Sequence, residues 1–363
     1  MSNPMIPAAK PVIGDEEREA VDRVLRSGMI AQGPEVAAFE REFAEQLVGG
    51  RACVAVSSGT SGLHLGLLAA GIGPGDEVIV PSFTFAATAN SVALTGATPV
   101  FADIDPVTFN LAPAAAEAAI TERTAAIMPV HLYGQPADMT AFTELTQRRG
   151  IQLFEDAAQA HGATWQGAPV GSFGTFAMFS LYPTKNMTSG EGGMVSCATP
   201  EVVRMMQLLR NQGMERRYAN EVVGFNARMT DVHAAIGRVQ LGKLPAWTAK
   251  RQSNAEFFNA NLEGVVTPAV ADGATHVWHQ YTIRVSGDRD AFAKALAEEH
   301  GVGSGVYYPI PNNELPSFGV EADLPDTAKA CAEVISLPVH PSLSEADLDR
   351  IVTAVNTVAA AGA

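Results

Sequence analysis

The sequence predicts an α/β fold in which a mostly parallel sheet of seven strands is flanked by helices, with a smaller C-terminal α+β domain. A chain of 363 residues is long enough for about two domains. Hydrophobic residues make up 47% and charged residues 17%, which is typical of a compact globular protein. Between residues 53 and 197, short apolar runs bounded by glycine and proline alternate with helical patterns. Such alternation indicates buried parallel strands covered on both faces.

The chain is expected to begin with two helices between Gly14 and Val48, separated by a break at Gly33-Pro34. The seven candidate strands follow at Cys53–Val56, Glu77–Val80, Pro99–Ala102, Ala125–Val130, Ile151–Glu155, Thr175–Ser180 and Gly193–Cys197. The helices expected between them are Thr60–Ala70, Phe85–Leu94 and Asp138–Arg149. Buried strands and amphipathic helices in this order predict the layered α/β arrangement.

Beyond Thr230 the alternation of short apolar runs with helical patterns ends. Residues Asp231–Phe258 predict one long helix, or two helices joined at Pro245. A strand, a helix, a second strand and a last helix are then expected at Gln280–Val285, Asp288–His300, Val302–Tyr307 and Glu345–Ala359. We place the domain boundary near Leu244–Lys250, which gives a large domain at 1–245 and a small domain at 246–363.

Charge and cysteine content exclude several classes of protein. The net charge of -15 argues against binding to nucleic acid, although local backbone amides can still bind a small anion. No run of about 18 apolar residues predicts a membrane span, and Met1–Gly14 lacks the pattern of a signal peptide. Cys53, Cys197 and Cys331 are widely spaced, so neither a disulfide framework nor a metal site is expected. We therefore expect a soluble cytoplasmic protein.

One candidate binding segment is Ser57-Ser58-Gly59-Thr60-Ser61-Gly62, where a predicted strand turns into a predicted helix. Free amides at a helix start, together with hydroxyls and a glycine that permits close approach, can bind a phosphate. Ordinary helix capping by serine and threonine explains the same residues equally well. The segment alone leaves both interpretations open.

A second segment, from Phe154 to Gly162, reads FEDAAQAHG and begins at the carboxyl end of a predicted strand. Ligands of open α/β sheets gather at such ends. The carboxylate of Asp156 could there pair with a protonated ring nitrogen of a cofactor. A capping aspartate and a metal ligand are the alternatives.

Lys185 follows a predicted buried strand and precedes the glycine-rich turn Ser189–Gly193. Burial disfavours the charged form of a lysine and leaves the neutral amine that a Schiff base requires. A solvated surface lysine is the alternative. A fourth segment, Gly224–Asp231, precedes the long helix, and its polar residues could equally be caps or contacts between domains.

Five runs occur in a fixed order: SSGTSGLHL, GDEVIVPSFTFAATAN, EDAAQAHGA, PTKNMTSGEGGM and GFNARMTDVHAAIGRVQL. Together they resemble the DegT/StrS family of sugar-nucleotide aminotransferases, which have the fold-type-I architecture of aspartate aminotransferase. The resemblance runs from Pro11 to Leu244 and continues more loosely through SLPVHPSLSEADL. It implies the cofactor pyridoxal 5'-phosphate (PLP).

The resemblance also implies roles for individual residues. Lys185 would hold PLP as a Schiff base and move the proton, and Asp156 would pair with the pyridine nitrogen. Gln159 would face the ring oxygen, and Phe85 would stack on the ring unless it is an ordinary core aromatic. The residues expected at the phosphate are Gly59, Thr60, Ser61 and Ser180, with Asn226 reaching the phosphate of a neighbouring subunit. A homodimer with shared active sites is therefore expected.

The implied reaction transfers an amino group from an amino acid, expected to be L-glutamate, to a nucleotide-linked keto-sugar. The run TFAATAN resembles members that act at C4, which favours a 4-keto-6-deoxyhexose. The chain departs from the family after Tyr307-Tyr308-Pro309, where many members carry a histidine and this sequence has Asn312 and Asn313. That departure concerns the sugar pocket and leaves the reaction type unaffected.

Several polar side chains are candidates for substrate binding, although each is also a common structural residue. The principal candidates are Tyr182, Arg228, His276 and Tyr307, and further ones are His131, Tyr133 and His279. Two other functions remain open on this scaffold. A PLP-dependent sugar dehydratase would carry a histidine at the lysine position, and a non-catalytic regulator would not need Lys185, Asp156 and Gln159 together.

Overall fold

The computed structural model describes residues 4–362. The first three residues of the predicted amino-terminal segment and the last residue of the predicted small domain lie outside the described part. Among the helices of residues 4–362, none is long and apolar enough to cross a membrane.

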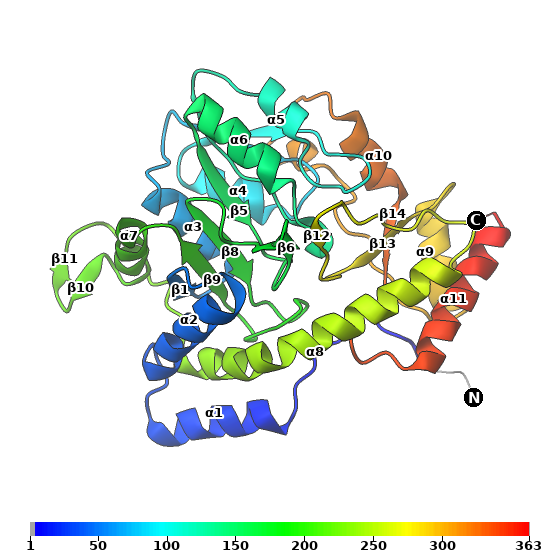
Figure 1. Cartoon of the computed structure of the whole chain (residues 1–363), viewed down its shortest axis with the longest axis horizontal. Coiled ribbons are helices and arrows are strands. Elements are labelled where there is room, and N and C mark those ends of the chain that lie inside the picture. The colour runs from blue at the N-terminus through cyan, green and yellow to red at the C-terminus, as the bar shows by residue number, and fades with distance from the viewer. Residues whose placement is uncertain (1–3, 363) are drawn as a thin grey trace.

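A seven-stranded sheet forms the centre of the molecule, as predicted (Figure 1). Its strands are β1 (Cys53–Val56), β2 (Glu77–Pro81), β3 (Thr98–Ala102), β4 (Thr124–Ile127), β5 (Gln152–Asp156), β8 (Phe176–Ser180) and β9 (Gly193–Cys197). Their spatial order is β1-β9-β8-β5-β4-β2-β3. The strand β9 runs opposite to the other six strands of this sheet, which are parallel to one another. The sheet is therefore mostly parallel.

Consecutive strand residues point to opposite faces of the sheet, and apolar side chains are buried on both faces. Along β1, Val54 and Val56 join one apolar core, whereas Cys53 and Ala55 join another. The first core is completed by α3 (Gly59–Ala69), α4 (Ala87–Leu94) and α7 (Pro200–Arg210). On the other face pack α2 (Pro34–Leu47), α6 (Met139–Arg149) and α8 (Asp231–Asn261), while α1 (Asp15–Ser27) lies against α8. The short α5 (Pro113–Ala118) packs beside α6.

The helix α8 is continuous over 31 residues, so the single-helix prediction is confirmed. Proline inside a helix removes one backbone hydrogen bond. Leu241 and Leu244 are buried in the sheet-facing core just before Pro245, and Ala255 and Phe258 are buried in the C-terminal core. Tertiary packing on both sides therefore supports the helix through Pro245 (Figure 1). The proposed boundary at residue 245 falls within this helix, and the division into two domains stays a prediction.

The C-terminal elements are β13 (Tyr281–Arg284), α9 (Arg289–Glu298), α10 (Pro325–Glu333), β14 (Val334–Leu337) and α11 (Glu345–Ala360). The predicted strand Val302–Tyr307 is wrong, because this segment makes only isolated bridges through Val302 and Gly305. The partner of β13 is instead β14, which runs antiparallel to it. Gly303 and Gly305 allow the intervening chain to lie close to its neighbours without regular pairing.

The remaining elements are short. A three-stranded sheet contains β6 (Thr164–Trp165), β7 (Ala168–Pro169) and β12 (Ala274–Thr275). A hairpin of β10 (Met214–Arg216) and β11 (Ala219–Asn220) projects from the body of the molecule (Figure 1). Two 3-10 helices lie at Leu132–Gly134 and Asn312–Glu314.

Candidate active site

A cavity of about 480 Å³ opens where the strands of the main sheet end. Asp156 and Ser180 are the last residues of β5 and β8, and both line it. The segments that follow β1, β2 and β4 line it as well, through Ser58, Thr84 and Val130. This is the carboxyl edge of the parallel strands, where the sequence predicted a ligand to bind.

Lys185 lies in a tight turn that follows β8 and lines the cavity. Its backbone N–H donates to the carbonyl of Tyr182 at 3.0 Å, and the next residue, Asn186, donates from Nδ2 to the carbonyl of Val277 at 2.8 Å. Burial lowers the pKa of the Lys185 ammonium to about 8, while the nearby Asp156 carboxylate acts in the opposite direction. The neutral amine is thus more populated near neutral pH than it would be for a solvated lysine.

The Asp156 carboxylate is buried and accepts two hydrogen bonds. Thr88 Oγ1 donates to Oδ2 at 2.7 Å, and the Ala158 N–H donates to Oδ1 at 3.1 Å. Burial raises the pKa of Asp156, although these two bonds and the charge of Lys185 oppose the shift. A cation brought into the cavity would therefore meet an oriented carboxylate that gains by pairing with it.

The helix α3 directs its amino terminus at the same cavity, and both Gly59 and Thr60 line it. Ser58 caps the helix by accepting from the Ser61 N–H at 3.1 Å, which leaves earlier amides of the helix without a partner inside it. A Cβ on Gly59 would lie 3.1 Å from the Ser180 Cβ, so glycine keeps this end of the cavity open. The arrangement suits an anion such as a phosphate.

Gln159 is held in one orientation by two hydrogen bonds. The backbone N–H of Tyr133 donates to its Oε1 at 2.6 Å, and its Nε2 donates to the Tyr308 hydroxyl at 2.8 Å. Since Oε1 must be the acceptor, the amide nitrogen is the group available to donate toward the cavity. Phe85 also lines the cavity and is 63% exposed, which is unusual for a core aromatic.

The structure brings most of the predicted side chains together, but not all of them. Besides the residues above, Tyr182, Tyr307 and His279 line the cavity. The Ser61 hydroxyl contacts that of Ser58 and does not line the cavity. The other predicted residues outside its lining are His131, Tyr133, Asn226, Arg228 and His276.

Three of these residues contact other parts of the chain, and a fourth is exposed. His131 contacts the buried Glu155, at 3.3 Å, and Arg228 donates to Asn211 at 2.7 Å. His276 stacks on Trp278, with ring centroids 3.9 Å apart, and burial lowers its pKa to about 3. Asn226 is exposed on the loop that precedes α8.

Sequence reasoning missed Thr88, Tyr308 and Gln280, which line the cavity as well. Thr84 and Thr88 are four residues apart, a spacing that brings side chains together and could have suggested the contact between their hydroxyls, but not the bond from Thr88 to Asp156. Tyr308 and Gln280 belong to C-terminal segments. No local sequence pattern predicts that these segments fold over the edge of the sheet.

Comparisons with known proteins support the family that the sequence motifs indicated. The model of the DegT/DnrJ/EryC1/StrS aminotransferase family matches residues 11–356. A protein from Geobacillus stearothermophilus named "Pleiotropic regulatory protein" is 43% identical over 349 residues, which cover 93% of this chain and 92% of that one. GDP-perosamine synthase of Caulobacter vibrioides is 42% identical over 369 residues, covering 98% of each chain.

The crystal structure of S. venezuelae DesV matches this structure with a TM-score of 0.92 and 38% sequence identity, covering 98% of this chain and 99% of that one. The fold-type-I architecture is thus confirmed. The cavity offers an amine, a carboxylate and a helix amino terminus, which are the groups that PLP requires. The chain belongs to the DegT/DnrJ/EryC1/StrS family of PLP-dependent aminotransferases.

Proposed function

We propose that this aminotransferase moves an amino group from L-glutamate to a nucleotide-linked 4-keto-6-deoxyhexose. The observation that carries the proposal is the shared cavity of Lys185, Asp156 and the amino terminus of α3. The name of the relative GDP-perosamine synthase supports a nucleotide-linked sugar as the acceptor. The TFAATAN run at residues 84–90 supports amination at C4.

Each side chain would have a distinct task. When bound, PLP supplies an electrophilic carbon and an electron-withdrawing ring. The Lys185 Nζ would hold the cofactor and, once released, would move a proton between the substrate carbon and the carbonyl carbon of the cofactor. Positioned proton transfer of this kind contributes typically about 10²–10⁴-fold to a rate.

Asp156 would keep the ring nitrogen protonated, and Thr88 would hold the Asp156 carboxylate in place through its 2.7 Å hydrogen bond. Gln159 would donate from Nε2 to the ring oxygen because Tyr133 fixes its Oε1 as an acceptor. Gly59, Thr60 and Ser180 would hold the phosphate, and Ser61 would support them through its contact with Ser58. Phe85 would cover the ring.

The proposal includes a homodimer in which each subunit completes the site of the other. Asn226 is exposed and lies outside the cavity lining of its own chain, which supports a role toward a neighbouring subunit. Large apolar side chains are also exposed nearby, including Val223 and Phe225 on the same loop and Tyr218 on the hairpin. Such a cluster is typical of a surface covered by a partner.

The test is a panel of keto-sugar nucleotides that differ in the carbonyl position and the nucleotide, each incubated with glutamate. Release of 2-oxoglutarate and the mass of the aminated product are measured. We expect a 4-keto-6-deoxy substrate to be aminated, and Lys185→Ala to lose both turnover and the absorbance of the covalently held cofactor. Preference for a 3-keto substrate would correct the position, and no turnover on any member despite bound cofactor would contradict the sugar assignment.

Two other functions are distinguished by the same assay. The relative named a regulatory protein makes a non-catalytic role the second candidate. A regulator would bind ligand without forming an aminated product. A dehydratase would release ammonia without requiring glutamate.

A further inference from the structure

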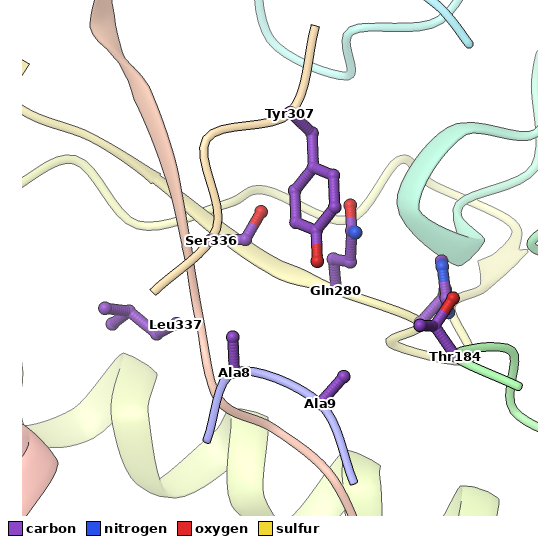
Figure 2. Close-up of a pocket in the computed structure, with 8 residues that line it drawn as sticks. Ala8, Ala9, Thr184, Gln280, Tyr307, Ser336 and Leu337 are labelled. Carbon is purple, nitrogen blue, oxygen red and sulfur yellow. The ribbon is translucent and has the colours of Figure 1, made fainter. Parts of the chain in front are cut away.

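The pair Asn312 and Asn313 joins a C-terminal segment to the loop that follows β2. This segment leaves the cavity wall at Tyr307 and Tyr308, and Figure 2 shows the Tyr307 side chain beside that of Gln280. The two asparagines follow on the chain, and neither lines the cavity. Both are buried, with exposed fractions of 2% and 3%. The departure from the family at these positions therefore changes the support of the cavity wall and not its lining.

Asn313 anchors the segment on Ser82. The Ser82 hydroxyl donates to Asn313 Oδ1 at 2.7 Å and accepts from the Asn313 N–H at 3.1 Å. Asn313 Nδ2 donates to the carbonyl of Val320 at 3.0 Å, which identifies Oδ1 as the acceptor. Because Ser82 is fully buried, these polar groups would be costly to leave unpaired. The anchor therefore holds the two segments in a fixed relative position.

Asn312 extends this anchor to the peptide that precedes Phe85. Its N–H donates to the Ser82 carbonyl at 3.0 Å, and its Nδ2 donates to the Thr84 carbonyl at 3.1 Å. The Thr84 carbonyl and the Phe85 nitrogen belong to one planar peptide unit. The hydrogen bond to that carbonyl thus fixes the orientation in which the chain enters Phe85.

Phe85 depends on its backbone for its position. Its side chain lines the cavity and is largely exposed, so packing against neighbouring residues does not hold the ring. The Phe85 carbonyl accepts from the Thr88 N–H at 3.1 Å, and the Thr88 hydroxyl donates to Asp156. The backbone of Phe85 is therefore held from both sides, by the start of α4 after it and by Asn312 before it.

We propose that Asn312 is a positioning residue for the cofactor. Its hydrogen bond to the Thr84 carbonyl keeps Phe85 where the ring can cover PLP, and Asn313 keeps Asn312 in place. This inference rests on the proposed role of Phe85 and deepens it. The affinity for PLP should therefore depend on Asn312, and it should do so through Phe85.

The experiment is a double-mutant cycle with PLP as the ligand. Asn312→Leu keeps a side chain of similar size and removes the donor to Thr84. Fluorescence titration of the cofactor-free proteins should show an affinity for PLP that is about fivefold weaker in this variant, the size expected for a displaced aromatic contact. Phe85→Ala should weaken binding by at least the same factor. Adding Asn312→Leu to Phe85→Ala should cause no further loss, because the ring that Asn312 positions is absent.

Two controls separate positioning from a general loss of stability. Asn356→Leu, on α11, removes an amide that is bonded on both sides, since Asn356 Nδ2 donates to the Asn261 carbonyl and its Oδ1 accepts from the Glu263 N–H. This variant should lose thermal stability, as Asn312→Leu does, and keep the wild-type affinity for PLP. The visible circular dichroism of the bound cofactor, which reports its surroundings, should change in Asn312→Leu and stay unchanged in Asn356→Leu.

Asn312→Ala gives a second test in which no apolar group of equal size replaces the amide. Wild-type affinity for PLP in both Asn312 variants would overturn the proposal, as would an equal loss of affinity with and without the Phe85 ring. The proposed role of Phe85 is then unaffected. If Phe85→Ala binds PLP as tightly as the wild type, the proposed role of Phe85 fails and the positioning role fails with it.

Discussion

Burial shifts the pKa values of the two charged side chains at the centre of the site in opposite directions. Removal from water lowers the pKa of Lys185 and raises that of Asp156, because it disfavours the charged form of each. Their mutual attraction opposes both shifts and is the smaller effect for each residue. The protein thus gives up some electrostatic stability to obtain a lysine that reacts as a neutral amine.

We expect covalent capture of PLP by the cofactor-free enzyme to follow the neutral fraction of Lys185. The capture rate should rise with pH and reach half of its maximum near pH 8, rather than near the ordinary lysine pKa of 10.5. Stopped-flow absorbance of the bound cofactor measures this profile. Asp156→Asn removes the anion that raises the lysine pKa and should move the midpoint below pH 8. A midpoint near 10.5 in the wild type would show that burial does not control this amine.

The residues that could be predicted from sequence are those within continuous motifs. Lys185, Asp156 and Gln159 lie in runs whose residue types already suggest their chemistry, and the structure brings them to one cavity. Gln280 and Tyr308 could not be predicted, because their position depends on how the C-terminal segments pack over the sheet edge. His276 and Arg228 were plausible on residue type alone and instead contact Trp278 and Asn211.

Among the elements, α3 and β9 meet at the proposed phosphate site with almost no space between them. A Cβ on Gly193, the first residue of β9, would lie 2.7 Å from the Ser58 carbonyl oxygen and 3.1 Å from the Gly59 nitrogen. These are backbone atoms and cannot rotate away. Glycine at 193 is therefore required for the loop that begins α3 to keep its position.

Gly193→Ala should displace this loop and weaken PLP binding by about tenfold or more, since the amides at the start of α3 would no longer point at the phosphate. Fluorescence titration of the cofactor-free protein with PLP gives the affinity. Gly73→Ala is the matched control, because a Cβ there meets nothing within 4 Å and the affinity should stay at the wild-type value. Wild-type affinity in Gly193→Ala would mean that the loop does not hold the phosphate.

At the scale of elements, the strands of the central sheet were predictable because each is a short apolar run bounded by turn residues. The strand β14 was missed although Val334–Leu337 is fully buried. It follows α10 directly, and an apolar run of four residues at the end of a helix looks like the continuation of that helix. The wrong strand at Val302–Tyr307 has β-branched and aromatic residues, but its glycines and its isolated bridges leave it irregular.

At the scale of the whole molecule, the charge of the cavity lining bears on the proposed homodimer. The main cavity is lined by Lys185, the one lysine or arginine side chain among its described lining residues. A cofactor phosphate and a nucleotide diphosphate bring several negative charges to that cavity. The exposed loop with Asn226 and the projecting hairpin with Arg216 and Arg217 lie outside it on the same chain. A second copy of the chain could supply additional hydrogen-bond donors and positive charges for these phosphates.

Shared sites can be tested by mixing two defective variants. Lys185→Ala removes the amine and Asn226→Ala removes the proposed phosphate contact to the neighbouring subunit, so each homodimer should be impaired at limiting PLP. In a mixed dimer, one site combines both defects and the other combines Lys185 of one subunit with Asn226 of its partner. After unfolding and refolding together, random pairing should restore activity to about a quarter of the wild-type value, because half of the dimers are mixed and each has one intact site.

Refolding Lys185→Ala with Lys185→Arg is the control, since no pairing of these variants restores the amine and activity should stay absent. Size-exclusion chromatography with light scattering confirms that dimers have formed before activity is measured. Activity no higher than the average of the two separate homodimers would show that Asn226 serves the cavity of its own chain or none. Recovery above that average requires that residues of two chains meet in one site, which is the arrangement that the exposure of Asn226 and its absence from the cavity lining of its own chain support.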